Sequence, residues 1–187
     1  MRIIAGDFRG RRLASLGKGD SAAQLRPTAD RVRESLFSAL QAGYNDPVTG
    51  ATVLDLFAGT GALGLEALSR GASQVTFVES GRVAQGLIAQ NIALCRAEDR
   101  TRLLRRDARR LGRNDGPKAD LVFLDPPYGK GLGEVALTNA MAGEWLAPGA
   151  LIVWEEGATI APPEGVRLDH TRQYGDTAIS ILRLVAP

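Results

Sequence analysis

The sequence predicts an α/β fold built on a doubly wound, largely parallel sheet with helices on both of its faces. From residue 51 onward, short apolar runs alternate with segments in which apolar residues recur at helical spacing, a pattern typical of such sheets. A glycine-rich turn joins the first strand-like run to the first helix-like segment. The 187 residues are enough for one domain with a substantial core.

The expected elements follow in chain order. Residues 2–5 and 11–13 favour a small hairpin or two short extended pieces. A helix should begin after Thr28, a good N-cap residue, and end near Gly43. Beyond it, strands are expected at 52–57, 74–79, 101–105, 120–125 and 149–154, and helices at 62–70, 81–95 and about 131–146, with a short one near 108–113.

Two further strand-like runs close the chain, at residues 165–168 and 177–182. They flank Tyr174-Gly175-Asp176, a turn sequence that favours an antiparallel hairpin. We expect residues 1–45 to form an N-terminal extension and residues 51–187 to form the main domain.

The turn after the first expected strand reads Asp55-Leu56-Phe57-Ala58-Gly59-Thr60-Gly61-Ala62-Leu63-Gly64. Glycines let the backbone approach a ligand closely, and amides at the start of the following helix are available to it. Glu79 ends the next apolar run about 20 residues further on, where a carboxylate can bind ribose hydroxyls. These features together indicate a nucleoside-bearing cofactor.

Two such cofactors compete, NAD(P) and S-adenosylmethionine. A pyrophosphate requires an uncharged turn and a helix N-terminus, and the carboxylate of Asp55 would repel it. The same carboxylate suits the cationic, amine-bearing end of S-adenosylmethionine. Asp55 therefore favours S-adenosylmethionine.

A second motif, Asp125-Pro126-Pro127-Tyr128, follows the apolar run 121–124. Neither proline can donate to a sheet ladder, so the strand ends here, at the sheet edge where open α/β sheets bind ligands. The Asp125 carboxylate and the Pro126 carbonyl can accept hydrogen bonds from an exocyclic amine, and Tyr128 offers a face for a planar base. The motif favours an aromatic-amine site; the plain alternative is a turn that carries a solvated Asp.

The composition of the chain excludes several classes of protein. Hydrophobic residues make up 44% and charged residues 24%, as in an ordinary globular protein. No apolar run is long enough for a membrane span, and the N-terminus lacks the apolar core of a signal peptide, so we expect a cytoplasmic protein. The single cysteine, Cys95, excludes an internal disulfide and a cysteine-based zinc site. The single histidine, His170, lies outside both motifs, and no metal cluster is visible.

The net charge is only +2, but basic residues are unevenly distributed. The densest N-terminal cluster is Arg9-Gly10-Arg11-Arg12, and a second basic region spans residues 96–118. Such stripes suit phosphate binding, and a solvated arginine-rich surface is the alternative. For the second region the solvated surface is the favoured interpretation.

With both motifs established, the chain resembles class I S-adenosylmethionine-dependent methyltransferases. More narrowly, it is similar to the bacterial RsmD-type enzymes, which methylate the N2 amine of a guanine in 16S ribosomal RNA. The resemblance rests on residues 1–6 with 9–11, on the segment 26–37, on 55–61 and on 125–128. The glycine turn and D-P-P-Y occur in many amine methyltransferases, whereas R-P-T-x-x-R-V-R-E at residues 26–34 is much narrower.

The resemblance implies a seven-stranded sheet whose last strand is antiparallel, a methyltransferase domain at 51–187, and roles for individual residues. The residues implied to hold the target base are Asp125, Pro126, Pro127 and Tyr128. Those implied to bind S-adenosylmethionine are Asp55, Phe57, Gly59, Gly61, Glu79 and Asp107. Asp107 would lie near the adenine amine, or be a surface charge between arginines. The candidate RNA-binding residues are Arg9, Arg11, Arg12, Arg26, Arg31 and Arg33.

The implied partner is 16S ribosomal RNA, in a small ribosomal subunit or an assembly intermediate, and nothing requires more than a monomer. The segment 26–33 would cover the cofactor, meet RNA, or simply form a capped amphipathic helix. Either Asp125 or water would take the proton released by the amine. The rival functions are an adenine-N6 methyltransferase, an NAD-dependent oxidoreductase and a non-catalytic RNA-binding protein.

Overall fold

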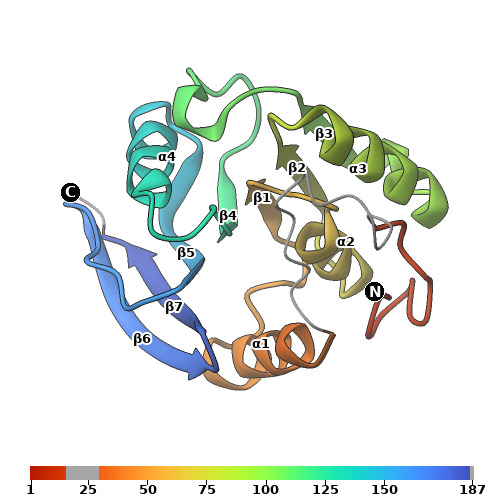
Figure 1. Ribbon diagram of the computed structural model, residues 1–187, viewed down its shortest axis with the longest axis horizontal. Coiled ribbons are helices and arrows are strands. Elements are labelled where there is room, and N and C mark those ends of the chain that lie inside the picture. The colour runs from red at the N-terminus through yellow and green to blue at the C-terminus, as the bar shows by residue number, and fades with distance from the viewer. Residues whose placement is uncertain (16–29, 186–187) are drawn as a thin grey trace.

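The computed structural model describes residues 1–15 and 30–185 and shows one mixed sheet of seven strands in the order β3-β2-β1-β4-β5-β7-β6 (Figure 1). Strands β1 to β5 pair in parallel, whereas β7 runs antiparallel to both β5 and β6. The predicted doubly wound sheet with an antiparallel last strand is confirmed. The strands are β1 (Thr52–Leu56), β2 (Gln74–Val78), β3 (Thr101–Leu104), β4 (Ala119–Leu124), β5 (Leu146–Glu156), β6 (Val166–Tyr174) and β7 (Thr177–Leu184).

Helices cover both faces of this sheet. Along β1 the buried side chains alternate between two apolar clusters, with Val53 in one and Leu54 in the other. The cluster that contains Val53 includes Leu36, Leu65 and Ile88, from α1, α2 and α3. The cluster that contains Leu54 is covered by α4 and the turn η2. The helices are α1 (Asp30–Gly43), α2 (Ala62–Ser69), α3 (Arg82–Cys95) and α4 (Leu132–Ala142), with 3-10 turns η1 (Glu98–Arg100) and η2 (Ala108–Arg110).

The boundary between α4 and β5 differs from the prediction of a helix to about residue 146. The helix ends at Ala142 because Glu144 adopts a positive φ of 61°, and the N–H of Trp145 turns back to the carbonyl of Ala140. The apolar residues Trp145 and Leu146 continued the helical spacing in the sequence. In the structure they lead into β5, which therefore begins earlier than expected.

The C-terminal hairpin forms as predicted, but its first strand is longer. β6 continues to Tyr174, through a polar stretch that gave no strand signal, because β7 pairs with it as far as Thr177. The short N-terminal pieces make one isolated bridge, between Arg2 and Arg12. The predicted N-cap Thr28 lies outside the described residues. Cys95 is buried and His170 is exposed on β6.

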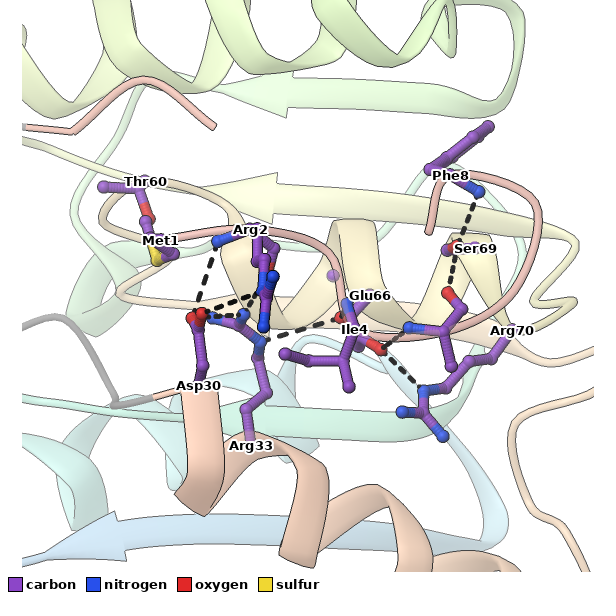
Figure 2. A network of polar contacts seen from close by, with 12 residues as sticks. Met1, Arg2, Ile4, Phe8, Asp30, Arg33, Thr60, Glu66, Ser69 and Arg70 are labelled. Carbon is purple, nitrogen blue, oxygen red and sulfur yellow. Dashed lines mark hydrogen bonds and ion pairs between the residues drawn. The ribbon is translucent and has the colours of Figure 1, made fainter. Parts of the chain in front are cut away.

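The N-terminal segment, defined here as residues 1–15, lies against α2 and α1 (Figures 1 and 2). The carboxylate of Glu66, on α2, is fully buried and accepts the backbone N–H groups of Ile4 (2.8 Å) and Ala5 (3.1 Å). The same carboxylate pairs with the guanidinium groups of Arg70 (2.7 Å) and Arg33 (3.7 Å). One buried charge thus attaches the segment to two helices.

Candidate active site

The predicted motifs meet at the C-terminal edge of the parallel strands, at the point where the strand order reverses. Leu56 of β1 pairs with Val78 of β2 on one side and with Leu124 of β4 on the other. The residues that follow these three positions therefore emerge side by side, and they include Glu79 and Asp125. Such a switch point is the usual ligand site of an open α/β sheet.

The glycine turn has the backbone geometry that close approach to a ligand requires. Phe57, Gly59 and Gly61 have φ values of 59°, 58° and 77°, in the left-handed region. This conformation is common for glycine, but it is strained for a bulky residue such as Phe57, and strain of this kind is frequent at functional sites. A side chain at Gly64 would come within 3.0 Å of the Asp55 carboxylate and 2.4 Å of Phe77. Gly64 therefore allows the helix to pack directly on the sheet.

Glu79 lies beside this turn, as predicted for a ribose-binding carboxylate. Its two carboxylate oxygens accept the backbone N–H groups of Gly59 (2.9 Å) and Gly81 (2.6 Å). A carboxylate can accept further hydrogen bonds, so the side chain is held in place while it remains able to bind hydroxyl groups. The structure therefore brings Asp55, the glycines and Glu79 into one site.

Asp55 has an unusual electrostatic environment. Its side chain is only 1% exposed, and burial raises the pKa of this carboxyl to about 8, with a smaller contribution from Glu79. The hydrogen bond from the N–H of Gly64 (3.0 Å) acts in the opposite direction. At neutral pH the carboxyl is largely protonated, and a cationic ligand placed next to it would favour ionisation.

The D-P-P-Y turn is held by β5. The hydroxyl of Tyr128 donates to the carboxylate of Glu155 (2.6 Å) and lies 3.1 Å from the hydroxyl of Thr177. The carboxylate of Glu156 accepts the N–H of Gly129, which follows the turn (2.9 Å). Burial and the bond to Glu155 raise the pKa of Tyr128. Sequence reasoning missed both glutamates, although each follows directly on an expected strand, where ligand-site residues concentrate.

Asp125 begins the turn, immediately after β4, and its backbone N–H points to the carbonyl of Leu56 (3.4 Å). Burial raises the pKa of its carboxyl, and the neighbouring carboxylates of Glu155 and Asp55 raise it further. Pro126 is buried and Pro127 is exposed. This edge of the sheet therefore gathers carboxyl groups that a cationic or amine-bearing ligand would help to ionise.

Asp107 follows β3 at the same edge, and its side chain is largely engaged. Its carboxylate accepts the backbone N–H of Arg109 (2.9 Å) and pairs with the Arg109 guanidinium (2.6 Å), which lowers the pKa of Asp107. An adenine amine would have to share this carboxylate with Arg109. Its role in cofactor binding stays a prediction.

The candidate RNA-binding arginines divide into exposed residues and residues whose side chains contact the protein itself. Arg9, Arg12 and Arg31 are exposed, whereas Arg11 stacks on the Phe8 ring (5.6 Å to the centroid) and donates to the carbonyl of Leu94. Arg26 lies outside the described residues.

The prediction that Arg33 contacts RNA is wrong. Its side chain is 0% exposed and its guanidinium donates to the carbonyl of Arg2 and to Asp30 (3.0 Å), as Figure 2 shows. Arg33 occupies one face of an amphipathic helix, and the buried carboxylate of Glu66 draws it inward.

Residues 1–15 and 30–185 contain neither a group of metal ligands nor a membrane-spanning helix. In this part of the chain, no group of three or more His, Cys, Asp or Glu residues could hold a metal ion. Within the same residues, no helix has the length and apolar character that crossing a bilayer requires.

Comparison with known proteins identifies the family. Residues 1–183 match the family described as Conserved hypothetical protein 95. Ribosomal RNA small subunit methyltransferase D of Escherichia coli is 39% identical over 155 residues, which are 83% of this chain and 74% of that protein. The protein of the same name from Haemophilus influenzae is 39% identical over 158 residues, 83% of this chain and 78% of that protein.

A solved structure agrees with this relationship. The structure of yhhF from Escherichia coli superposes with a TM-score of 0.84 at 36% identity, and covers 100% of this chain and 99% of that one. Fold and sequence similarity thus agree along nearly the whole chain. The chain belongs to the Conserved hypothetical protein 95 family and is an RsmD-type ribosomal RNA methyltransferase.

Proposed function

We propose that this protein transfers a methyl group from S-adenosylmethionine to the exocyclic N2 amine of a guanine in 16S ribosomal RNA. The observation that carries the proposal is the placement of the Asp125-to-Tyr128 turn next to Asp55 and the glycine turn, at one edge of the sheet. An amine-binding motif and a cation-binding carboxyl would then lie close together, since the charge of Asp55 acts on Asp125. The names of the curated relatives support ribosomal RNA of the small subunit as the substrate.

The residues present fit S-adenosylmethionine. The buried carboxyl of Asp55, with its pKa of about 8, gains a compensating charge when a cationic group binds beside it. Glu79 offers acceptors to ribose hydroxyls, and the left-handed turn at Gly59 and Gly61 lets the backbone come close to the ligand. When bound, S-adenosylmethionine supplies a methyl group on a positively charged sulfur.

Asp125 and the Pro126 carbonyl would accept the two N–H groups of the guanine amine. The lone pair of this nitrogen is delocalised into the ring, so the amine is a poor nucleophile. Holding its protons favours a pyramidal nitrogen and directs the lone pair, and orientation of this kind can supply about 7 kcal/mol or more. The raised pKa of Asp125 makes its carboxylate a better acceptor for the proton that the methylated nitrogen loses.

Tyr128 would stack on the target base after the base has left its RNA helix or loop. The bond from its hydroxyl to Glu155 (2.6 Å) fixes the ring before the base arrives. The exposed Arg9, Arg12 and Arg31 would bind RNA phosphates. We further propose a monomer that acts in the cytoplasm on the small subunit or on one of its assembly intermediates.

In the deciding experiment, the protein is incubated with labelled S-adenosylmethionine and unmodified small ribosomal subunits. The ribosomal RNA is then digested to nucleosides and analysed by mass spectrometry. Label in N2-methylguanosine supports the proposal. Label in N6-methyladenosine would replace guanine by adenine as the target. The Asp125→Asn protein is the matched control, and we expect it to bind cofactor normally and to transfer methyl groups at least about 100-fold more slowly, because it keeps an acceptor but loses the base.

A further inference from the structure

Asn91, on α3, is a fully buried polar residue that joins two parts of the chain far apart in sequence. Its side-chain oxygen accepts the backbone N–H of Ala14 (2.7 Å), and its nitrogen donates to the carbonyls of Ala14 (3.1 Å) and Thr60 (2.9 Å). The amide thereby uses its acceptor and both of its N–H groups. A hydrophobic residue could fill the space but would leave three backbone groups, one buried and two partly buried, without this partner.

Thr60 belongs to the glycine turn and lies between Gly59 and Gly61. Its carbonyl is held by Asn91, and its hydroxyl lies 3.9 Å from the sulfur of Met1, next to which Figure 2 shows it. The same residue of the turn therefore touches both ends of the N-terminal segment, Met1 directly and Ala14 through Asn91.

The N-terminal segment is also attached to α2, the helix that starts at this turn. Glu66 accepts the N–H groups of Ile4 and Ala5, and the Ser69 hydroxyl accepts the N–H of Phe8 (2.8 Å) and donates to the carbonyl of Ala5 (2.5 Å). Between these attachments and Ala14 the segment exposes Arg9 and Arg12. The position of this basic surface is thus tied to the position of the turn.

We propose that Asn91 is a positioning residue that couples the cofactor turn to the basic N-terminal segment, so that cofactor binding and RNA binding strengthen each other. A ligand that orders the turn fixes the Thr60 carbonyl, and Asn91 transmits this order to Ala14 and the segment that contains Arg9 and Arg12. The coupling is reciprocal by thermodynamic necessity. This inference rests on the proposed function, because it requires that S-adenosylmethionine binds at the turn and RNA at the segment.

The test measures the affinity for S-adenosylhomocysteine by calorimetry, and the affinity for a fluorescent 16S ribosomal RNA fragment with and without S-adenosylhomocysteine. For the unchanged protein we expect S-adenosylhomocysteine to tighten RNA binding about tenfold, within the usual range of coupling between sites. Asn91→Asp keeps the acceptor for Ala14 but presents a carboxylate to the carbonyls of Ala14 and Thr60. We expect its coupling factor to fall to about one, with a raised KM for S-adenosylmethionine and a kcat within about twofold at saturation.

Two further variants separate coupling from general damage. Gln90→Ala changes an exposed amide one position earlier on α3 and should keep the full coupling factor. Ser69→Ala loosens the segment at its other attachment and leaves Asn91 intact. We expect it to keep its affinity for S-adenosylhomocysteine alone and to lose part of the coupling; it remains informative if Asn91→Asp melts below the assay temperature.

A folded Asn91→Asp protein with the coupling factor of the unchanged protein would refute the inference. So would an unchanged protein that binds both ligands independently, and in that case the proposed function would still stand. Failure of the proposed function is visible separately, as an unchanged protein that does not bind S-adenosylhomocysteine or that methylates a different base.

Discussion

At the scale of single residues, the site depends on carboxyl groups whose pKa the fold raises. Asp55 was predicted from its place before the glycine turn, and Asp125 from the prolines that follow it. Neither prediction included their raised pKa, because it depends on packing and on neighbours distant in sequence, such as Glu79 and Glu155. The local sequence identified the chemical groups, and the packing sets their protonation.

Asp55 should make the protein less stable as the pH rises. The carboxyl has its pKa raised from 3.8 to about 8 on folding, so between these values the folded state holds a proton that the unfolded state has lost. The free energy of unfolding should therefore fall by about 1.4 kcal/mol per pH unit within this window. Urea unfolding of Asp55→Asn between pH 5 and about 8 should show a flatter dependence than the unchanged protein.

The exposed Asp7 provides the control, since Asp7→Asn should keep the dependence of the unchanged protein. Asp55→Asn should also bind S-adenosylmethionine poorly, because it cannot become negatively charged. An equally steep pH dependence in Asp55→Asn would show that other carboxyls with a raised pKa, such as Asp125, dominate.

Tyr128 combines a stacking surface with a hydroxyl that fixes its ring. Tyr128→Phe keeps the stacking surface and loses the hydrogen bond to Glu155. We expect its kcat to fall about 5-fold, which corresponds to the loss of a hydrogen bond that contributes about 1 kcal/mol, with little change in KM for RNA. Tyr128→Ala loses the stacking as well, which is worth about 1–3 kcal/mol per base, and should also raise KM for RNA. Steady-state kinetics on small subunits measure both, and equal kinetics for the two variants would exclude stacking.

At the scale of elements, the N-terminal segment is attached through side chains of α2 rather than through a sheet ladder. The sequence indicated short extended pieces at both of its ends but not their partner, because Glu66 and Ser69 belong to an ordinary helical pattern. Nothing in a helical pattern distinguishes a buried glutamate that accepts backbone N–H groups from a solvated one. The error about Arg33 has the same origin, since its partner Glu66 lies on another helix.

Replacing Glu66 should therefore destabilise the protein strongly. Glu66→Gln leaves the buried guanidinium of Arg33 and the largely buried one of Arg70 without their shared counter-charge, and loss of one partner of a buried ion pair costs about 3–5 kcal/mol. Hydrogen exchange should show faster exchange at the N–H groups of Ile4 and Ala5, and urea unfolding should show the loss of stability. Glu34→Gln, on the exposed side of α1, is the control and should change stability by less than about 0.5 kcal/mol.

At the scale of the whole molecule, the alternating pattern predicted the sheet, its connections and the edge at which both motifs meet. The pattern did not predict the boundary between α4 and β5. The helix ends there because Glu144 adopts a positive φ, and this conformation leaves no signal in the local sequence. The polar part of β6 was missed because its pairing with β7 is decided by tertiary contacts.

The distribution of charge over the surface leads to a prediction about RNA. Arg9→Ala combined with Arg12→Ala should weaken binding of a 16S ribosomal RNA fragment and lower the slope of log affinity against log salt by about 1 per lost phosphate contact. Arg105→Ala with Arg110→Ala removes two exposed charges from the second basic region and is the matched control. Equal slopes for the two double variants would exclude the N-terminal cluster as a specific phosphate-binding surface.

The position of β7 has a consequence for how the protein folds during synthesis. β7 lies between β5 and β6, although it follows both along the chain. Until residues 177–184 have left the ribosome, β5 has an open edge and β6 has no partner at all. Unpaired strand edges recruit other chains. We therefore expect the nascent protein to be most prone to aggregation before β7 has emerged, and shielding by the ribosome or a chaperone to matter most at this stage.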